Sequence, residues 1–466
     1  MRIYNTLSGT KEEFIPLHGN KVNMYACGIT VSGEAHIGHA YQALIYDIIR
    51  KFLIKQGYDV TYARNYTDVD DKIIARAKEA GIPADAYAKM MIKKIDKVMR
   101  EMEVDDPDIW LKATDNIDNI IDFVSELVKK GHAYPTAKGD VYFSVESFAP
   151  YGRLSHRNLE DALNGVRIEN DDEKKNPLDF ALWKSAKEGE ICWDSPWGKG
   201  RPGWHIECSA MNRKAFGDEV DIHGGGRDLI FPHHENEIAQ SEAHNGCEFS
   251  HYWMHNGYIN IDGTKMSKSL GNFKTVRDLL QHYDGEVLRF LILSGQYRGP
   301  IDFNSEILEQ SRNAMTRLRN AKSNLNHLIE TGSGSMTDEE KEKLAGYDKY
   351  RQEFIKAMDD DLNTADAISA VFELVTAINT AVKDGASKEF AEKSLATLME
   401  LATVLGLLQQ DVEEKVEIDD ELAALIEERQ QARKEKNFAR ADEIRDMLKA
   451  RGLILSFGRT PLQAQS

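Results

Sequence analysis

The sequence is poor in cysteine and contains no long apolar run. Its 466 residues include four cysteines, Cys27, Cys192, Cys208 and Cys247, which are too few for the disulfide framework of a small secreted domain. No apolar stretch is long enough to span a bilayer, and the first residues lack the basic, apolar and small-residue blocks of a signal peptide. These absences favour a cytoplasmic protein with no membrane partner, in which any functional cysteine is a ligand or a nucleophile.

Positive charge is also scarce, since the formal net charge is −18. Such a charge argues against a nucleic-acid partner for the chain as a whole, although binding depends on the local potential. One segment differs: residues 429–451 carry eight lysines and arginines against four acidic residues. By itself, a segment of this kind is more often a solvated amphipathic helix than a binding surface.

The N-terminal part alternates between strand and helix patterns. The hydrophobic content of 41% with 29% charged residues is typical of a globular protein, and the length predicts several domains. Apolar spacing predicts strands over residues 21–27 and 58–66, each followed by a helix, over 35–56 and 70–80. This order predicts an α/β fold with a parallel, doubly wound sheet of the Rossmann type. Ligands of such sheets bind at the carboxyl ends of the strands.

The pattern changes twice further along the chain. Residues 116–200 predict an insertion with a helix over 117–130, a hairpin over 133–144 and tryptophan-rich loops, before the sheet resumes with a strand over 220–223 and a helix from about His234. Beyond residue 304 the chain predicts helices alone. They cover residues 305–331, 338–358, 364–384 and 388–408, with two short basic helices within 419–452.

Two short motifs indicate a site for a polyphosphate. The first is the pentapeptide Lys265, Met266, Ser267, Lys268 and Ser269. Two lysines in a hydroxyl-bearing loop can follow the charge that develops on a leaving pyrophosphate. The second motif places His36, Gly38 and His39 where a strand loop enters a helix, a position that favours phosphate, and the glycine admits a nucleotide ring. Together, in this order, the motifs resemble the signature of class I aminoacyl-tRNA synthetases.

Four further residues suit a zinc ion. Cys27 ends the first strand, Cys208 lies in a separate segment, and His233 and Glu237 are four residues apart. A helix that begins near Pro232 would place the last two on one face. Two thiolates, an imidazole and a carboxylate are good zinc ligands. Spacing alone leaves two alternatives open, because free cysteines are often inert core residues and His–Glu pairs are common on helix surfaces.

Across nearly its whole length, the sequence resembles cysteinyl-tRNA synthetases. The resemblance lies in residues 25–28, 35–39, 65–74, 203–209, 221–226 and 231–237. It implies that Cys27, Cys208, His233 and Glu237 bind one zinc ion. Zinc prefers a thiolate to a hydroxyl, so such a site would separate cysteine from serine at the binding step. Trp204 is then a candidate wall of the cysteine pocket and Thr67 a candidate contact to its polar end, although both could be ordinary packing residues.

The resemblance also implies a two-step reaction. The carboxylate of L-cysteine attacks the α-phosphate of ATP, with Mg²⁺ on the phosphates, and the adenylate then acylates the terminal ribose of tRNA(Cys). His36, His39, Lys265 and Lys268 would stabilise the developing charge. The remaining residues of the two motifs, Gly38, Met266, Ser267 and Ser269, would complete the ATP site. The resemblance to this family also implies that the protein is a monomer.

The main alternative is a ligase that joins cysteine to an amino-sugar in mycothiol synthesis and shares both ATP motifs and the zinc ligands. Residues 359–364 and 432–445 argue against it, because they resemble the helical-bundle (DALR-type) motif and the anticodon-binding end of the synthetases. A non-catalytic RNA-binding or zinc-structural protein would have decayed ATP motifs. The expected divisions are a catalytic domain (1–115 and 201–250), an inserted connective-peptide domain (116–200), a stem-contact region (251–304), a helical bundle (305–408) and an anticodon-binding domain (418–466).

Overall fold

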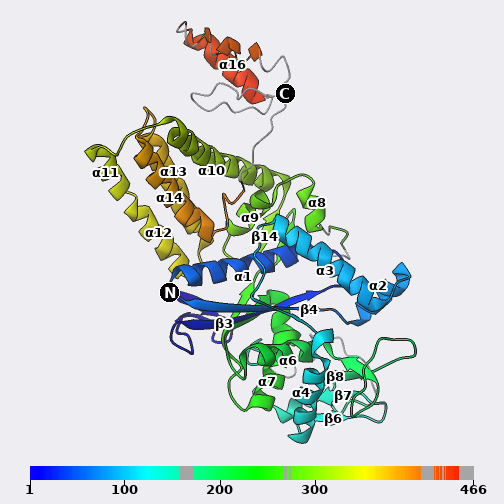
Figure 1. Ribbon diagram of the computed structural model, residues 1–466. Coiled ribbons are helices and arrows are strands. Elements are labelled where there is room, and N and C mark those ends of the chain that lie inside the picture. Colours follow the sequence, from blue (N-terminus) through cyan, green and yellow to red (C-terminus); the bar gives the residue numbers. More distant parts are fainter. Residues whose placement is uncertain are drawn as a thin grey trace. The chain divides into compact units, whose positions relative to one another are not determined.

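The computed structural model (Figure 1) divides into two compact units, Met1–Gln409 and Gln410–Ser466. It describes residues 1–157, 173–266, 270–272, 274–410, 424–425, 427–429, 431–432, 435 and 437–450. Within these residues, no helix is both long enough and apolar enough to cross a membrane.

A sheet of five parallel strands forms the centre of the first unit. The strands are β3 (Lys21–Thr30), β4 (Asp59–Thr67), β5 (Ile109–Lys112), β10 (Val220–Gly226) and β11 (Ser250–Asn256). Their order is β11-β10-β3-β4-β5. The chain first adds strands on one side of β3 and then crosses over to add β10 and β11 on the other side, so the strand order switches between β3 and β10. This arrangement confirms the doubly wound α/β fold, and a ligand is expected at the carboxyl ends of β3 and β10.

Each of the first two strands of this sheet along the chain is followed by one or two helices. After β3 comes α1 (Ile37–Lys55), and after β4 come α2 (Asp71–Ala80) and α3 (Ala84–Glu101). A short antiparallel pair, β1 (Arg2–Asn5) and β2 (Thr10–Glu13), precedes them. The central strands are buried along most of their length, as expected when both faces of a parallel sheet are covered.

The strand β3 runs further than the sequence predicts. It continues through Gly28 to Thr30, with an irregularity in its pairing with β4 between Ala26 and Ile29. A Cβ atom on Gly28 would lie 1.5 Å from the backbone oxygen of Asn65. This glycine therefore permits the close approach of two strands rather than ending the first one.

The predicted insertion lies between β5 and β10. It begins with α4 (Ile117–Lys129) and forms an antiparallel sheet of β6 (Ala133–Pro135), β7 (Val141–Phe143), β8 (Phe180–Ser185) and β9 (Gly200–Pro202). The hairpin is confirmed, with Tyr134 paired to Tyr142. The helix α6 (Trp204–Phe216) then returns the chain to the sheet, and α7 (Glu235–Asn245) follows β10. These elements lie together in the lower part of Figure 1.

After β11 the chain forms a small mixed sheet and then helices. The small sheet consists of β12 (Ile259–Ile261), β13 (Thr264–Lys265) and β14 (Ile301–Phe303), with α8 (Val276–Leu280) and α9 (Gly285–Leu293) inserted between β13 and β14. The bundle follows as α10 (Ser305–Thr331), α11 (Asp338–Ala345), α12 (Asp348–Asp359), α13 (Thr364–Ala381) and α14 (Lys388–Val404).

One predicted helix of the bundle is divided in two. The sequence predicts a single helix over residues 338–358, whereas α11 ends at Ala345 and is capped by Gly346, and α12 begins after Tyr347. Glycine is a poor helix former, and the break allows the ring of Tyr347 to be buried near that of Phe390, with 6.2 Å between ring centroids. A tertiary contact thus decides the boundary.

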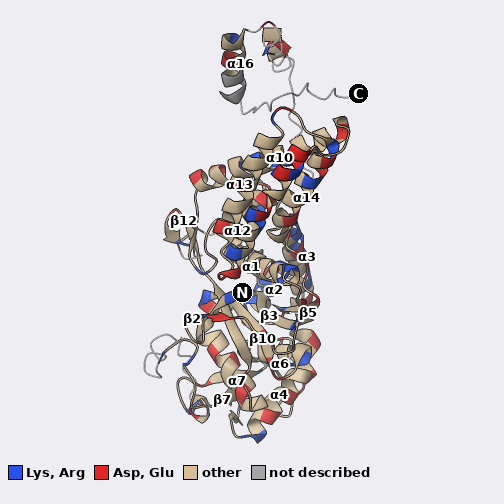
Figure 2. Ribbon diagram, turned by 90° about the vertical axis from the view of Figure 1, so that its left-hand side faces the viewer, with Lys and Arg blue, Asp and Glu red and all other residues tan. Residues whose placement is uncertain are grey.

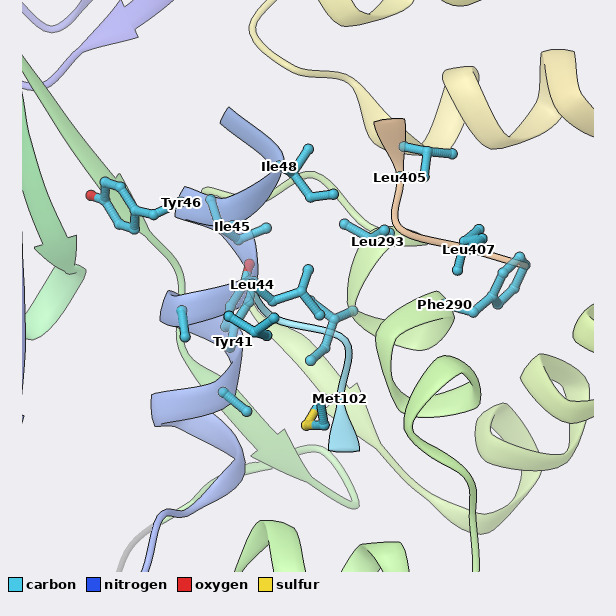
Figure 3. Close-up of a cluster of buried hydrophobic side chains, with 14 of the residues drawn as sticks. Tyr41, Leu44, Ile45, Tyr46, Ile48, Met102, Phe290, Leu293, Leu405 and Leu407 are labelled. Carbon is cyan, nitrogen blue, oxygen red and sulfur yellow. The ribbon is translucent and has the colours of Figure 1, made fainter. Parts of the chain in front are cut away.

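A buried cluster of side chains joins α1 to α9 and to the segment that follows the last helix of the bundle (Figure 3). Leu44 and Ile48 of α1 lie in the same core as Leu293 of α9 and Leu405, just past the end of α14. Arg289 crosses this core: its Nη2 lies 2.6 Å from an Asp47 carboxylate oxygen, and its Nε donates to the Leu405 oxygen. The helix whose first turn carries the histidine motif is therefore held on the bundle.

Charges of both signs lie next to one another on the bundle (Figure 2). Arg351 pairs with Glu400, Lys393 with Glu389 and Lys341 with Asp338. In the second unit, α16 (Phe438–Ala450) bears Arg440, which pairs with Glu428 and Glu443. This helix agrees with one of the two basic helices that the sequence predicts. The remaining residues of that segment lie partly outside the described part of the chain, as do the final residues.

Candidate active site and metal centre

The four predicted metal ligands meet at one buried point. Cys27 lies on β3, Cys208 on α6, His233 in a π-helical turn (Ile230–His234) and Glu237 on α7. Their ligand atoms all lie within 4.8 Å of one another. Glu237 Oε1 is 3.1 Å from Cys27 Sγ and 2.9 Å from His233 Nε2. None of the four is more than 2% exposed.

The two ligands on the α7 side share a face, as the sequence predicts. His233 lies in the turn that leads into α7, and Glu237 lies one turn later, so their side chains point the same way. The two cysteines come from separate elements that pack against this helix. Three segments far apart in the sequence therefore converge, so the two cysteines lie beside potential metal ligands rather than apart from them.

The donor set fits a zinc ion. Tetrahedral zinc with bonds of about 2.0–2.3 Å requires ligand atoms about 3.3–3.8 Å apart, and the four atoms here need only small adjustments to reach this spacing. Without a cation, two thiols and a carboxylate would be crowded together in the core, and buried anions are costly. A divalent cation removes this cost.

The pKa shifts of these ligands also indicate a site that favours positive charge. Burial opposes the protonated imidazole of His233, but the Glu237 carboxylate and a hydrogen bond with Cys208 outweigh burial and raise the pKa to about 10. Burial likewise opposes the charged form of Glu237. The neighbouring His223 and His233 nevertheless hold the pKa of its carboxyl well below its usual value.

Two histidines that the sequence analysis did not select complete a second possible ligand set. Cys27, His223, His234 and Glu237 also have ligand atoms within 4.8 Å of one another. His223 Nε2 lies 3.1 Å from Glu237 Oε2 and 3.5 Å from Cys27 Sγ. Two sequence features involve these histidines: His223 ends a predicted strand just before three glycines, and His234 directly follows His233. Neither has a spacing that indicates a metal.

His234 also belongs to a buried chain of hydrogen bonds. Its Nδ1 lies 2.7 Å from His255 Nε2, and His255 Nδ1 lies 2.8 Å from the Thr6 hydroxyl. Burial lowers the pKa of His234 well below its usual value and that of His255 to about 3. Both rings are therefore neutral, and they connect the metal centre with the N-terminal segment.

The ring of His233 is held on two further sides. Its Nδ1 lies 2.9 Å from His205 Nδ1, an outer contact of the kind that orients a metal-binding imidazole. The Trp204 ring packs against it with 4.4 Å between centroids. Trp204 remains 41% exposed, so the predicted pocket wall borders both the metal centre and solvent.

Thr67 lies at the carboxyl end of β4 and is buried. Its hydroxyl donates to Glu207 Oε2 over 2.7 Å. Burial, only partly offset by this hydrogen bond, raises the pKa of Glu207 well above its usual value. Glu207 is a third residue that the sequence does not point to, since a glutamate next to Cys208 has no diagnostic spacing.

The two ATP motifs are also brought together. The backbone N–H of Ile37 donates to the Lys274 oxygen over 3.3 Å, and that of Val276 donates to the Ala35 oxygen over 2.9 Å. A Cβ on Gly38 would lie 3.9 Å from the Met266 methyl group. The segment after the lysine pentapeptide therefore pairs with the histidine motif, although Ser267, Lys268 and Ser269 lie outside the described residues.

The described groups of these motifs are partly open to solvent. His36 precedes the first turn of α1, and its backbone N–H donates to His39 Nδ1 over 3.3 Å. The two rings stack with 3.5 Å between centroids. Lys265 is exposed, with its ammonium 3.6 Å from the centroid of the Tyr258 ring. These are donors and cations at a helix N-terminus, where an anion is favoured.

Three family models match the chain. They are described as "tRNA synthetases class I (C) catalytic domain" over residues 13–313, "DALR domain" over 353–409 and "Cysteinyl-tRNA ligase anticodon binding domain" over 415–455. With the doubly wound sheet and the paired motifs, they define a class I aminoacyl-tRNA synthetase. Methionyl-tRNA synthetase of Mycobacterium tuberculosis has the same fold, with a TM-score of 0.58 at 14% identity, covering 83% of this chain and 89% of that one.

Closer relatives identify the family within this class. The chain is 50% identical to the cysteine–tRNA ligase of Symbiobacterium thermophilum, covering 98% of this chain and 97% of the relative. It is also 50% identical to that of Lachnospira eligens, covering 98% of both. The chain belongs to the cysteine–tRNA ligase family.

Proposed function

We propose that this chain activates L-cysteine with ATP and transfers it to the 3′ terminal ribose of tRNA(Cys). The observation that carries this proposal is the convergence of Cys27, Cys208, His233 and Glu237 from β3, α6 and the turn and helix after β10. The same unit pairs the segment after the lysine pentapeptide with the histidine motif. A centre with two thiol ligands suits a thiol substrate. The adjoining motifs suit a nucleotide.

The four ligands would hold one zinc ion. When bound, zinc supplies a Lewis acid that accepts the substrate thiolate and discriminates against a hydroxyl. The protein provides the remaining selectivity: Trp204 would wall the pocket beside His233, and Thr67, fixed by Glu207, would contact the polar end of the amino acid. Shape alone would reject serine poorly, because serine differs from cysteine at one atom.

The activation step needs no protein nucleophile. The cysteine carboxylate attacks the α-phosphorus of ATP in line, the bond to the bridging oxygen breaks, and pyrophosphate leaves with Mg²⁺. His36 and His39 would donate hydrogen bonds to the phosphate oxygens, while Lys265 and Lys268 would neutralise the charge that develops on the leaving group. Gly38, Met266, Ser267 and Ser269 would complete the ATP site.

The second substrate is proposed to be tRNA(Cys), bound by a monomeric, cytoplasmic enzyme. The matches to the DALR and anticodon-binding models support this proposal. So does the basic balance of residues 429–451, because phosphate contacts dominate nucleic-acid affinity. The ligase for an amino-sugar is less well supported, since a small acceptor needs no anticodon-binding module.

The proposed functional divisions follow the sequence. Two catalytic segments flank a connective-peptide insertion, and a stem-contact region, a helical bundle and an anticodon-binding domain follow. Their proposed bounds are 1–115, 116–200, 201–250, 251–304, 305–408 and 418–466.

The decisive experiment compares cysteine with serine as a substrate for charging purified tRNA(Cys), before and after removal of zinc. We expect cysteine charging to depend on zinc and serine charging to stay far lower. Equal charging of both amino acids, or indifference to chelation, would contradict the zinc assignment. Charging of an amino-sugar in place of tRNA would contradict the proposed acceptor.

A further inference from the structure

A loop of the insertion is hydrogen-bonded to the start of α7, next to two of the proposed metal ligands. Glu235, in the first turn of α7, is completely buried. Its carboxylate accepts the backbone N–H of Gly152 over 2.9 Å and that of Ser155 over 2.8 Å. The hydroxyl of Ser155 donates to the same carboxylate over 2.8 Å.

The loop, residues 151–157, is closed upon itself in a shape that presents these N–H groups. The Arg157 N–H donates to the Gly152 oxygen over 3.0 Å. Gly152 has φ +99°, and a Cβ there would lie 2.1 Å from the Arg157 oxygen. Only glycine fits this position. The N–H groups of Gly152, Leu154 and Ser155 together form a receptor for the Glu235 carboxylate.

Further contacts fix the loop on both sides of His233. Tyr151 donates to the Asn236 side-chain oxygen over 2.5 Å. On the other side, the Arg157 guanidinium lies 4.8 Å from the centroid of the Phe231 ring. The loop thus contacts the residues just before and just after this metal ligand.

Side chains around the start of α7 therefore serve two neighbours. His233 and Glu237 point to the metal centre, while Glu235 and Asn236 hold the loop. Among the described residues, no lysine or arginine forms an ion pair with Glu235, so its charge depends on the loop donors. A buried carboxylate that loses such partners is destabilised by the full cost of its desolvation. The helix and the loop are therefore held in one relative position.

We infer that Glu235 is a positioning residue for the metal centre. Of the four proposed ligands (the quartet), two come from β3 and α6. The other two come from the turn and helix that Glu235 connects to the loop. If α7 shifted, His233 and Glu237 would move away from Cys27 and Cys208, and the four potential ligand atoms would no longer lie close enough to share one ion. Glu235 itself does not touch the quartet. Its effect on cysteine selection rests on the function proposed above, whereas its effect on metal binding does not.

The test replaces Glu235 with glutamine, Glu235→Gln, in the full-length protein. The amide keeps the size but turns an NH₂ group toward an N–H donor. We expect zinc affinity to fall about 10–100-fold, the range for residues that support metal ligands. The d–d absorption bands of the Co²⁺-substituted protein should also shift, and the KM for cysteine should rise while that for ATP stays unchanged.

The matched control is Glu242→Gln on the same helix. Glu242 pairs with Arg153 of the same loop but lies further from the quartet. This variant should lower the Tm, yet leave zinc affinity, the Co²⁺ spectrum and the KM for cysteine unchanged. If both variants lowered the Tm and neither changed zinc affinity or the spectrum, Glu235 would be a structural residue only and the inference would be wrong.

A milder variant covers the case in which Glu235→Gln does not fold. Ser155→Ala removes one hydrogen bond from the carboxylate and should weaken zinc binding by a smaller factor. Unchanged zinc affinity in this variant would also overturn the inference. Failure of the proposed function would look different, because the unmodified protein would then bind zinc without supporting cysteine-dependent pyrophosphate exchange.

Discussion

The two ends of the candidate active site are built in opposite ways. At the metal end, no described ligand is more than 2% exposed, and a strand, a turn and two helices supply the four side chains. At the phosphate end, His36, Gly38 and His39 are half-buried, and Lys265 is exposed. The metal end is a fully buried cluster of polar side chains. The phosphate end is a partly solvent-exposed surface of hydrogen-bond donors and cations.

This difference matches the two tasks proposed for the site. Discrimination between a thiol and a hydroxyl requires fixed, desolvated ligands, because their preference is strongest where water cannot compete. A polyphosphate has to enter, react and leave as pyrophosphate, so its partners must stay within reach of solvent. The two ends should therefore fail separately when they are mutated.

The largest expected effect is at the metal end. Cys208→Ser replaces a thiolate with a harder, weaker zinc ligand. We expect zinc affinity to fall by at least about 1000-fold, since even outer residues of metal sites are worth about 10–100-fold. Competition with a chromophoric chelator measures the affinity, and cysteine-dependent pyrophosphate exchange measures the activity. Unchanged zinc affinity would remove Cys208 from the ligand set and favour the one with His223 and His234.

The next effect separates the two ends. Lys268→Ala removes one cation from the proposed ATP site and should lower kcat for cysteine-dependent pyrophosphate exchange about 100–1000-fold. Zinc content and Tm should stay the same. Lys341→Ala, on the exposed surface of α11, is the control and should have near-normal activity. Near-normal exchange in the Lys268 variant would show that its assigned role is wrong.

Two glycine substitutions compare the ends directly. In Gly28→Ala the new methyl group meets a backbone oxygen that cannot move aside, and the free energy of unfolding should fall by about 2–3 kcal/mol. In Gly38→Ala the nearest atom is His36 Nδ1, 3.0 Å away at the end of a side chain. Its stability should change by less than about 0.5 kcal/mol while the KM for ATP rises. Urea unfolding of both variants tests this contrast, and equal destabilisation would contradict it.

The smallest expected effect lies at the rim of the metal end. Trp204→Ala removes the ring that packs on His233 and should raise the KM for cysteine about 10-fold, in line with the worth of an aromatic contact. The KM for ATP should not change. Trp110 is a matched control, because it is 37% exposed and stacks on Tyr66 with 4.3 Å between centroids. An equal rise in the Trp110→Ala variant would show that the effect is not specific to the pocket.

Much of the fold could be predicted because its signals are local. The alternation of apolar strands and helices before residue 80 predicts the doubly wound sheet, and α10 has the bounds expected from its apolar spacing. The errors occur where packing overrides propensity. Gly28 predicts a strand end but permits a close strand contact, and the break at Gly346 allows Tyr347 to be buried.

The metal centre shows the same limit. Cys27, Cys208, His233 and Glu237 are implied by the resemblance to cysteinyl-tRNA synthetases, since the scarcity of cysteine and the i, i+4 pair alone leave alternatives open. His223, His234 and Glu207 could not, because nothing in their spacing distinguishes them from core residues. Their relation to the centre arises only when β10 and α6 pack beside α7.

The sequence by itself determines which chemical groups are available. These are a lysine pentapeptide and a histidine motif at fixed spacing, and a thiol-rich donor set spread over three separate segments. The tertiary structure decides which of these groups meet and how firmly they are held. It pairs the segment after the lysine pentapeptide with the histidine motif through backbone hydrogen bonds, buries the proposed metal ligands and holds α7 against the insertion through Glu235. Contacts between segments far apart in the chain depend on packing, and packing has no local signature.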